Sequence, residues 1–157
     1  MATLAGRLLD IAELLLVSGD RSAAFRRRAV STAYYAVFHA IDKLCADYVS
    51  RSAKRSSLEY LRVYRALDHG PLKDAFSKSP LKDDGVLRTV GSAVVILQNE
   101  RHRADYLPPI ANIFTHDRAT ELVGMAREVV QQIELIKPAS RECRMLALGL
   151  LFKERKS

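Results

Sequence analysis

The chain has 157 residues, of which 48% are hydrophobic and 27% charged, and it carries a formal net charge of +7. This composition excludes a disordered chain, and the length suffices to bury a core without disulfides or a structural metal. No run of alternating apolar residues predicts a sheet. We therefore expect an all-α fold, an antiparallel bundle of about five helices followed by a C-terminal helix.

The N-terminal segment predicts an amphipathic helix that Gly19 ends in a left-handed conformation. Its apolar face is expected to consist of residues at helical spacing, Leu4, Leu8, Ile11 and Leu15. Arg7, Asp10 and Glu13 interrupt these apolar residues, which neither the core of a signal peptide nor a membrane span would tolerate well. We expect a protein that is neither exported nor membrane-spanning.

Residues 20–49 predict one long helix, capped by Asp20 or Ser22, on which the other helices pack. Its core stripe recurs at steps of three and four residues: Val30, Ala33, Tyr34, Val37, Ile41, Leu44 and Tyr48. A polar line follows the same spacing: Arg28, Thr32, Tyr35 and His39. This line is either a solvated flank with hydrogen bonds between helices or part of a functional surface.

The middle of the chain predicts shorter elements. The polar, basic stretch 50–57 is expected to be a mobile connection, and a helix follows over about 57–67. We expect that helix to end at His69, Gly70 and Pro71, and a short helix to follow over 72–76.

The last third of the chain predicts three helices, over about 87–106, about 115–136 and 140–153. The first has an arginine, Arg101, on its apolar seam. Thr115 or Asp117 is expected to open the second and Ser140 to cap the third. We expect a single domain over 1–157, with a core over about 4–136.

Basic residues cluster at four places, 26–28, 51–55, 101–103 and 153–156. Such clusters attract phosphates, so RNA or DNA is a plausible partner, although solubility alone also explains them. Cys45 and Cys143 have no neighbour at metal-ligand or disulfide-framework spacing, which favours the reducing cytoplasm. We expect no metal and no cofactor.

Two strings of the chain, AYYAVFHA in 33–40 and RHRADY in 101–106, stand in the same order and separation as in one known family. With the intervening YRALDHG, they make the chain resemble bacterial members of the HEPN family over most of residues 25–136. The resemblance implies a helical bundle, frequent homodimerisation and RNA-associated or toxin–antitoxin and defence roles. It also implies metal-independent RNase activity in some members, and a nucleotidyltransferase-like antitoxin as a partner.

RNase members of the family carry an Arg, then four to six residues, then a His, which together serve 2′-hydroxyl attack. The formal match here is Arg62 to His69, a spacing expected about once by chance. In the stretch most similar to the family's active region, Asp105 stands roughly where such a His would lie. This departure favours an alternative, a non-catalytic interaction or dimerisation module.

The residues around Arg101 therefore allow two interpretations, one structural and one functional. In the structural one, Arg101 pairs with Asp105 four residues on, or with Asp42 or Asp47, and His102 stacks on Tyr106.

In the functional interpretation, the surface around Arg101 binds and cleaves RNA. The candidate catalytic residues are Arg101, His102 and His39, and the candidate nucleic-acid contacts are Arg28, Tyr35, Arg103, Asp105 and Tyr106. Arg101 and Arg103 would contact phosphate and stabilise charge, His102 or His39 would transfer protons, and Tyr35 or Tyr106 would stack or orient.

Overall fold

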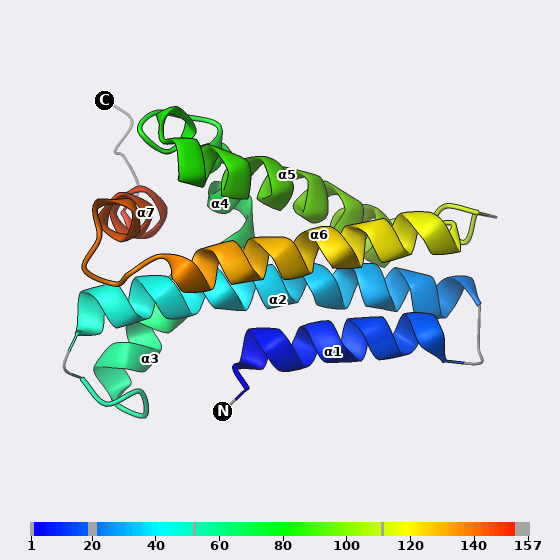
Figure 1. The fold of residues 1–157 in the computed structure, drawn as a ribbon, viewed down its shortest axis with the longest axis horizontal. Helices are drawn as coiled ribbons and strands as arrows, with labels where there is room; N and C mark the ends of the chain where they lie inside the picture. The colour runs from blue at the N-terminus through cyan, green and yellow to red at the C-terminus, as the bar shows by residue number, and fades with distance from the viewer. Residues whose placement is uncertain (1, 19–21, 52, 111, 153–157) are drawn as a thin grey trace. The chain divides into compact units, whose positions relative to one another are not determined.

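A computed structural model describes residues 2–18, 22–51, 53–110 and 112–152. These residues form seven α-helices and one 3-10 helix packed as a bundle, without a strand among them, which confirms the all-α prediction. The elements are α1 Leu4–Val17, α2 Ala23–Ser50, α3 Leu58–Tyr64, α4 His69–Phe76, η1 Leu81–Asp83, α5 Gly85–Tyr106, α6 His116–Leu135 and α7 Arg141–Leu151 (Figure 1). No helix in these ranges combines the length and apolar character that a bilayer span requires.

The chain divides into two compact units. The first consists of Met1–Ala40 and Ala93–Gln131, and the second of Ile41–Ser92 and Gln132–Ser157. The boundaries fall inside α2, α5 and α6, so the chain passes from one unit to the other within helices rather than through linkers. The prediction of a single domain stays a prediction.

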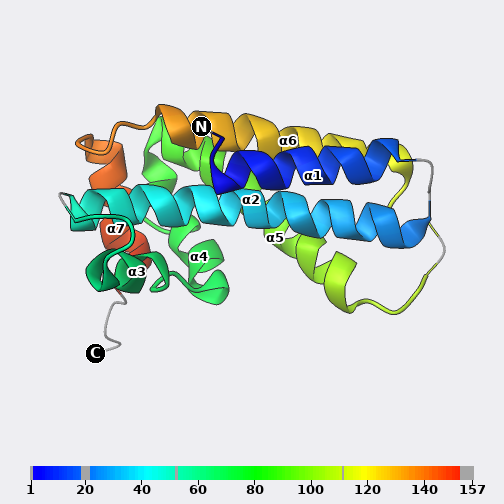
Figure 2. The ribbon, with the colours of Figure 1, turned by 90° about the horizontal axis from the view of Figure 1, so that it is seen from below.

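The first unit contains four helical segments that run alternately in opposite directions, from α1, α2, α5 and α6 (Figures 1 and 2). The part of the predicted α2 stripe that belongs to this unit lies in its core, since Val30, Ala33, Tyr34 and Val37 are fully buried. Tyr48, the last member of the predicted stripe, is only partly buried. The seam of α5 is also buried, including Arg101 at 9% exposure. Hydrophobic burial of these stripes is the main force that holds the helices together.

The predicted buried face of α1 is wrong. The buried residues lie one position further along, at Ala5, Leu9, Ala12 and Leu16. Leu4 and Ile11, assigned to the core from their spacing, are 53% and 48% exposed. Both sets of residues have helical spacing, because α1 is apolar on more than one side, so spacing alone does not identify the buried face.

Side-chain caps explain where several helices begin. Thr115 and Ser140 accept hydrogen bonds from the backbone N–H groups of Arg118 and Cys143, both at 3.1 Å, as the sequence predicts for these two residues. α2 begins at Ala23, directly after Ser22, whose carbonyl accepts a bond from the Arg26 N–H at 3.3 Å. The predicted roles of Gly19 and Asp20 lie outside the described residues.

The predicted break at His69, Gly70 and Pro71 is also wrong. α3 already ends at Tyr64, and these three residues form the first turn of α4. Proline is tolerated there because first-turn N–H groups have no acceptor four residues earlier within the helix. In the second unit α4 then packs with η1 and α7 (Figure 2).

Candidate functional site

Arg101 is a buried cation on the apolar seam of α5. Its side chain is 11% exposed, and its Nε lies 3.7 Å from Oδ2 of Asp105, one helical turn further on. Within the described part of the chain, Nε makes no hydrogen bond. A buried guanidinium with so little hydrogen bonding needs other stabilisation, because its desolvation is costly.

Three tyrosine rings supply that stabilisation. The Arg101 Cζ lies 5.3 Å from the ring centroid of Tyr34, 5.5 Å from that of Tyr35 and 6.0 Å from that of Tyr106. Each contact is within cation–π range and contributes about 0.5–2 kcal/mol. We call Arg101, Tyr34, Tyr35, Asp105 and Tyr106 the Arg101 cluster.

The geometry of α2 explains how two consecutive residues reach one cation. Side chains one residue apart on a helix diverge by about 100°, so Tyr34 and Tyr35 approach Arg101 from different directions. Tyr34 is fully buried, whereas Tyr35 is partly exposed, and their rings meet edge to face at 5.6 Å. The cluster therefore reaches from the core to the surface.

The surface end of the cluster is an aromatic pair. The ring centroids of His102 and Tyr106 are 4.9 Å apart, and Tyr106 is 67% exposed. The two pairs expected from four-residue spacing, Arg101 with Asp105 and His102 with Tyr106, are both confirmed. The functional roles of these residues stay predictions.

Two other predicted site residues do not join the cluster. Nη1 of Arg103 donates to both carboxylate oxygens of Glu100, at 2.9 and 3.0 Å, and the Arg103 Cζ lies 5.7 Å from the Phe114 ring centroid. Arg28 is exposed on α2 and, among the described residues, has no ion pair. Arg28 is therefore available to a ligand, whereas Arg103 is already engaged.

His39 is a partly buried imidazole on α2. Its ring packs edge-on against Phe38 at 6.0 Å. Burial lowers its pKa below the ordinary 6.5, so the ring is neutral at pH 7. A neutral imidazole accepts a proton, which is the state that a general base requires.

The basic cluster at 26–28 mainly holds the backbone between α5 and α6. Arg26 Nε donates to the Phe114 carbonyl at 2.6 Å, and Arg27 donates to the carbonyls of Leu107 and Pro108. Two of the three arginines thus satisfy backbone acceptors of that connection. Their clustering in the sequence has a structural explanation.

Tyr34 is the member of the cluster that the sequence assigns only to the core. Its spacing on α2 correctly predicts burial, but nothing in that spacing indicates a contact with an arginine 67 positions later in the sequence. The available signal was the adjacent Tyr34–Tyr35 pair together with an arginine on an apolar seam, since a buried cation needs aromatic or anionic neighbours.

Asp47, considered as a partner for Arg101, has other partners. It accepts hydrogen bonds from Lys43 at 2.8 Å, from the Tyr60 hydroxyl at 2.9 Å and from Arg55 at 3.2 and 3.3 Å. Burial raises the pKa of Asp47, but these bonds outweigh it and hold the pKa below its ordinary value. Arg55 of the basic stretch 51–55 is therefore also a structural residue.

No group of three or more His, Cys, Asp or Glu side chains in the described ranges is arranged to hold a metal ion. Comparisons of this chain with protein-family models, with curated proteins and with solved structures gave no match.

Proposed function

We propose that this chain is an RNA-associated module of the HEPN type, which binds single-stranded RNA at the exposed end of the Arg101 cluster. The observation that carries the proposal is the His102–Tyr106 pair, an exposed aromatic platform placed next to a buried cation. Unpaired bases stack on such rings, and stacking contributes about 1–3 kcal/mol per base. The net charge of +7 favours the approach of a polyanion.

The geometry supports binding better than cleavage. The Arg101 guanidinium, which would stabilise the charge of a scissile phosphate, is enclosed by tyrosines and paired with Asp105. An arginine in this setting orders the surface side chains rather than reaching a ligand. Members of the resembled family that cleave RNA do so without metal, so the two activities are separable by experiment.

The test is fluorescence anisotropy of a labelled single-stranded RNA at 50 and 200 mM salt. We expect affinity to fall steeply with salt and Tyr106→Ala to weaken binding about tenfold, with Tyr106→Phe close to the unsubstituted protein. Leu135→Ala removes an 81% exposed apolar side chain elsewhere and is the matched control. Salt-insensitive binding, or an unchanged affinity in Tyr106→Ala, would refute the proposal.

Cleavage is tested separately with mixed RNA in EDTA. We expect no cleavage by the unsubstituted protein. Cleavage that is lost in His102→Ala, with circular dichroism unchanged, would instead place a metal-independent RNase at this surface.

A second candidate function is self-association through α1. Four of its apolar residues are solvent-exposed along one side: Leu4, Ile11, Leu14 and Val17. α1 also contains one basic and two acidic residues, Arg7, Asp10 and Glu13, within a chain of net charge +7. Asp10 and Glu13 pair with Arg127 of α6, so the surface around α1 carries no excess of positive charge that would oppose the approach of a second copy. This observation favours a homodimerisation module, and in such a module a nucleotidyltransferase-like antitoxin would be the further partner.

A further inference from the structure

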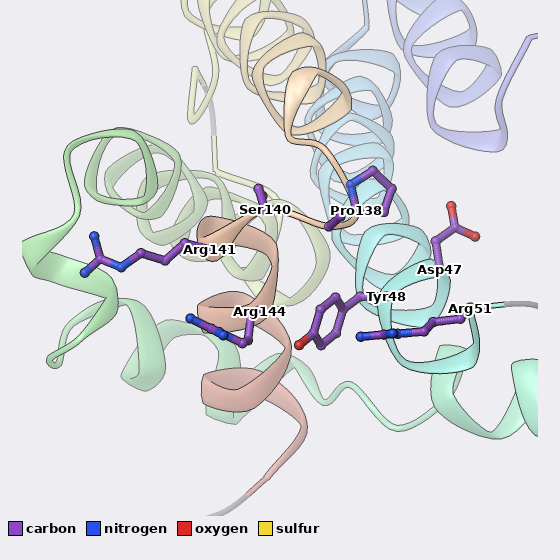
Figure 3. A pocket seen from close by; sticks show the side chains of 8 residues that line it. Asp47, Tyr48, Arg51, Pro138, Ser140, Arg141 and Arg144 are labelled. Carbon is purple, nitrogen blue, oxygen red and sulfur yellow. The ribbon is translucent and has the colours of Figure 1, made fainter.

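The second unit has a concavity of about 520 Å³ where α2 ends and α7 begins. Its lining includes Tyr48 and Arg51 from the end of α2 and Ser140 and Arg144 from the start of α7 (Figure 3). This volume lies in the range of pockets for small ligands.

The charges around the concavity are unbalanced. Asp47 also lines it, but Lys43 and Arg55 already neutralise that carboxylate. In the described part of the chain, Arg51 and Arg144 have no carboxylate oxygen within 4 Å. Arg51 and Arg144 therefore line one hollow without an anionic partner among the described residues.

Tyr48 lies between these two arginines. The Arg51 Cζ is 5.9 Å from the Tyr48 ring centroid, and Figure 3 shows Arg144 on the other side of the ring. Arg141, which also lines the hollow, extends on the side of α7 away from Tyr48 in this view. The Arg144 guanidinium also points away from Tyr48 in this view, so Arg51 and the ring are the groups in contact, and Arg144 adds a second cation to the lining.

The backbone of Arg51 is strained. Its φ of 36° lies in the left-handed region, which disfavours residues with a Cβ and favours glycine. An arginine at a position where glycine fits better indicates that its side chain has a use. Arg51 packs on Tyr48 but has no ion pair with a described residue.

We propose that this concavity binds a small ligand through a diphosphate group. Arginine binds phosphate oxygens in a two-pronged geometry. Two arginines without an ion pair among the described residues match the charge of a diphosphate better than that of a single monoanion. The Tyr48 ring offers a stacking surface if the diphosphate carries a base. This site is separate from the proposed RNA surface and involves none of its residues.

The test is isothermal titration calorimetry of the full chain with inorganic pyrophosphate and with ADP at 150 mM salt. We expect both to bind, since both carry a diphosphate. ADP binding at least about threefold tighter, with the difference lost in Tyr48→Ala, would identify a nucleotide as the ligand. Equal binding would identify the diphosphate group alone.

Arg51→Gly is the decisive variant, because glycine relieves the backbone strain while it removes the guanidinium. We expect at least about tenfold weaker binding together with an unchanged or higher unfolding temperature. Arg144→Gln should weaken binding similarly. Arg62→Gln, on the exposed side of α3 and outside the concavity, is the charge-matched control and should bind normally.

Absence of binding by both diphosphates, or binding that Arg51→Gly and Arg144→Gln leave intact, would overturn the proposal. Equal weakening by Arg62→Gln would also overturn it, because it would show an effect of net charge only. The RNA assay with Tyr106→Ala is independent of these results, so the two proposals can fail separately.

Discussion

Asp42 is a carboxyl group that the fold keeps away from water. It is 3% exposed on α2 in the second unit, and burial raises its pKa from 3.8 to about 8. Below pH 4 the carboxyl is protonated in both the folded and the unfolded chain. Between pH 4 and 8 the unfolded chain releases the proton while the folded chain retains it.

It follows that folding loses stability as pH rises through this window. We predict a loss on the order of 3 kcal/mol between pH 4 and pH 8 that Asp42→Asn abolishes. Urea unfolding at pH 5, 7 and 9 measures the free energy of unfolding of the unsubstituted protein and of Asp42→Asn. The difference between the two values removes the contributions of titratable groups that both proteins share. Burial, and to a lesser extent the charge of Asp42, raises the pKa of the neighbouring Tyr64 to about 12. Tyr64 therefore titrates above this pH window. Parallel pH profiles for the two proteins would contradict the prediction.

Single-residue contacts differ in how far the sequence predicts them. Arg101 with Asp105 and His102 with Tyr106 lie one turn apart on the same helix, so spacing places them together. The contact of Arg101 with Tyr34 joins two helices, and its geometry depends on how they pack. The ion pair of Arg103, and the lack of one for Arg28 among the described residues, likewise depend on local neighbours that periodicity does not specify.

At the scale of elements, α4 and α5 meet at a glycine. A Cβ added to Gly91 would lie 2.6 to 2.9 Å from atoms of the Phe76 side chain, which is itself buried. Gly91 therefore permits close packing, although it lies inside a helix where glycine is otherwise unfavourable. The gain from packing Phe76 offsets this local cost.

We predict that Gly91→Ala destabilises the protein by about 1–3 kcal/mol through overpacking. Gly124→Ala is the matched control, because Gly124 also lies inside a helix but has nothing within 4 Å of an added Cβ. It should stabilise by about 0.5–1 kcal/mol. Thermal and urea unfolding measure both, and a stabilised Gly91→Ala would show that α4 and α5 do not meet as described.

The sequence predicts the buried face of a helix that has one apolar face, but not that of a helix with two apolar faces. The α6 seam of Ala119, Leu122, Ala126, Val129 and Ile133 is buried as its spacing predicts. α1 has apolar residues on two sides, so its buried face depends on the neighbouring helices. The sequence does not identify the start of α4, because proline and glycine, which often end helices, also fit a first helical turn.

At the scale of the whole molecule, the exposed side of α1 predicts a dimer. We expect the protein to sediment as a homodimer at micromolar concentration and Leu14→Glu to shift it to the monomer, because the charge would be buried in the interface. Leu135→Glu, at a position 81% exposed on α6, should leave the assembly unchanged. A monomeric unsubstituted protein, or a dimer insensitive to Leu14→Glu, would exclude α1 as the interface.

The distribution of aromatic residues gives this chain a spectroscopic property of its own. It has no tryptophan and six tyrosines. Tyr34, Tyr35 and Tyr106 surround Arg101, Tyr48 lies in the concavity, and Tyr60 and Tyr64 pair at 6.2 Å on α3. Intrinsic emission therefore arises at both proposed binding sites without an added label, and replacing Tyr48 or Tyr106 with phenylalanine would assign a ligand-induced change in intensity to one of them.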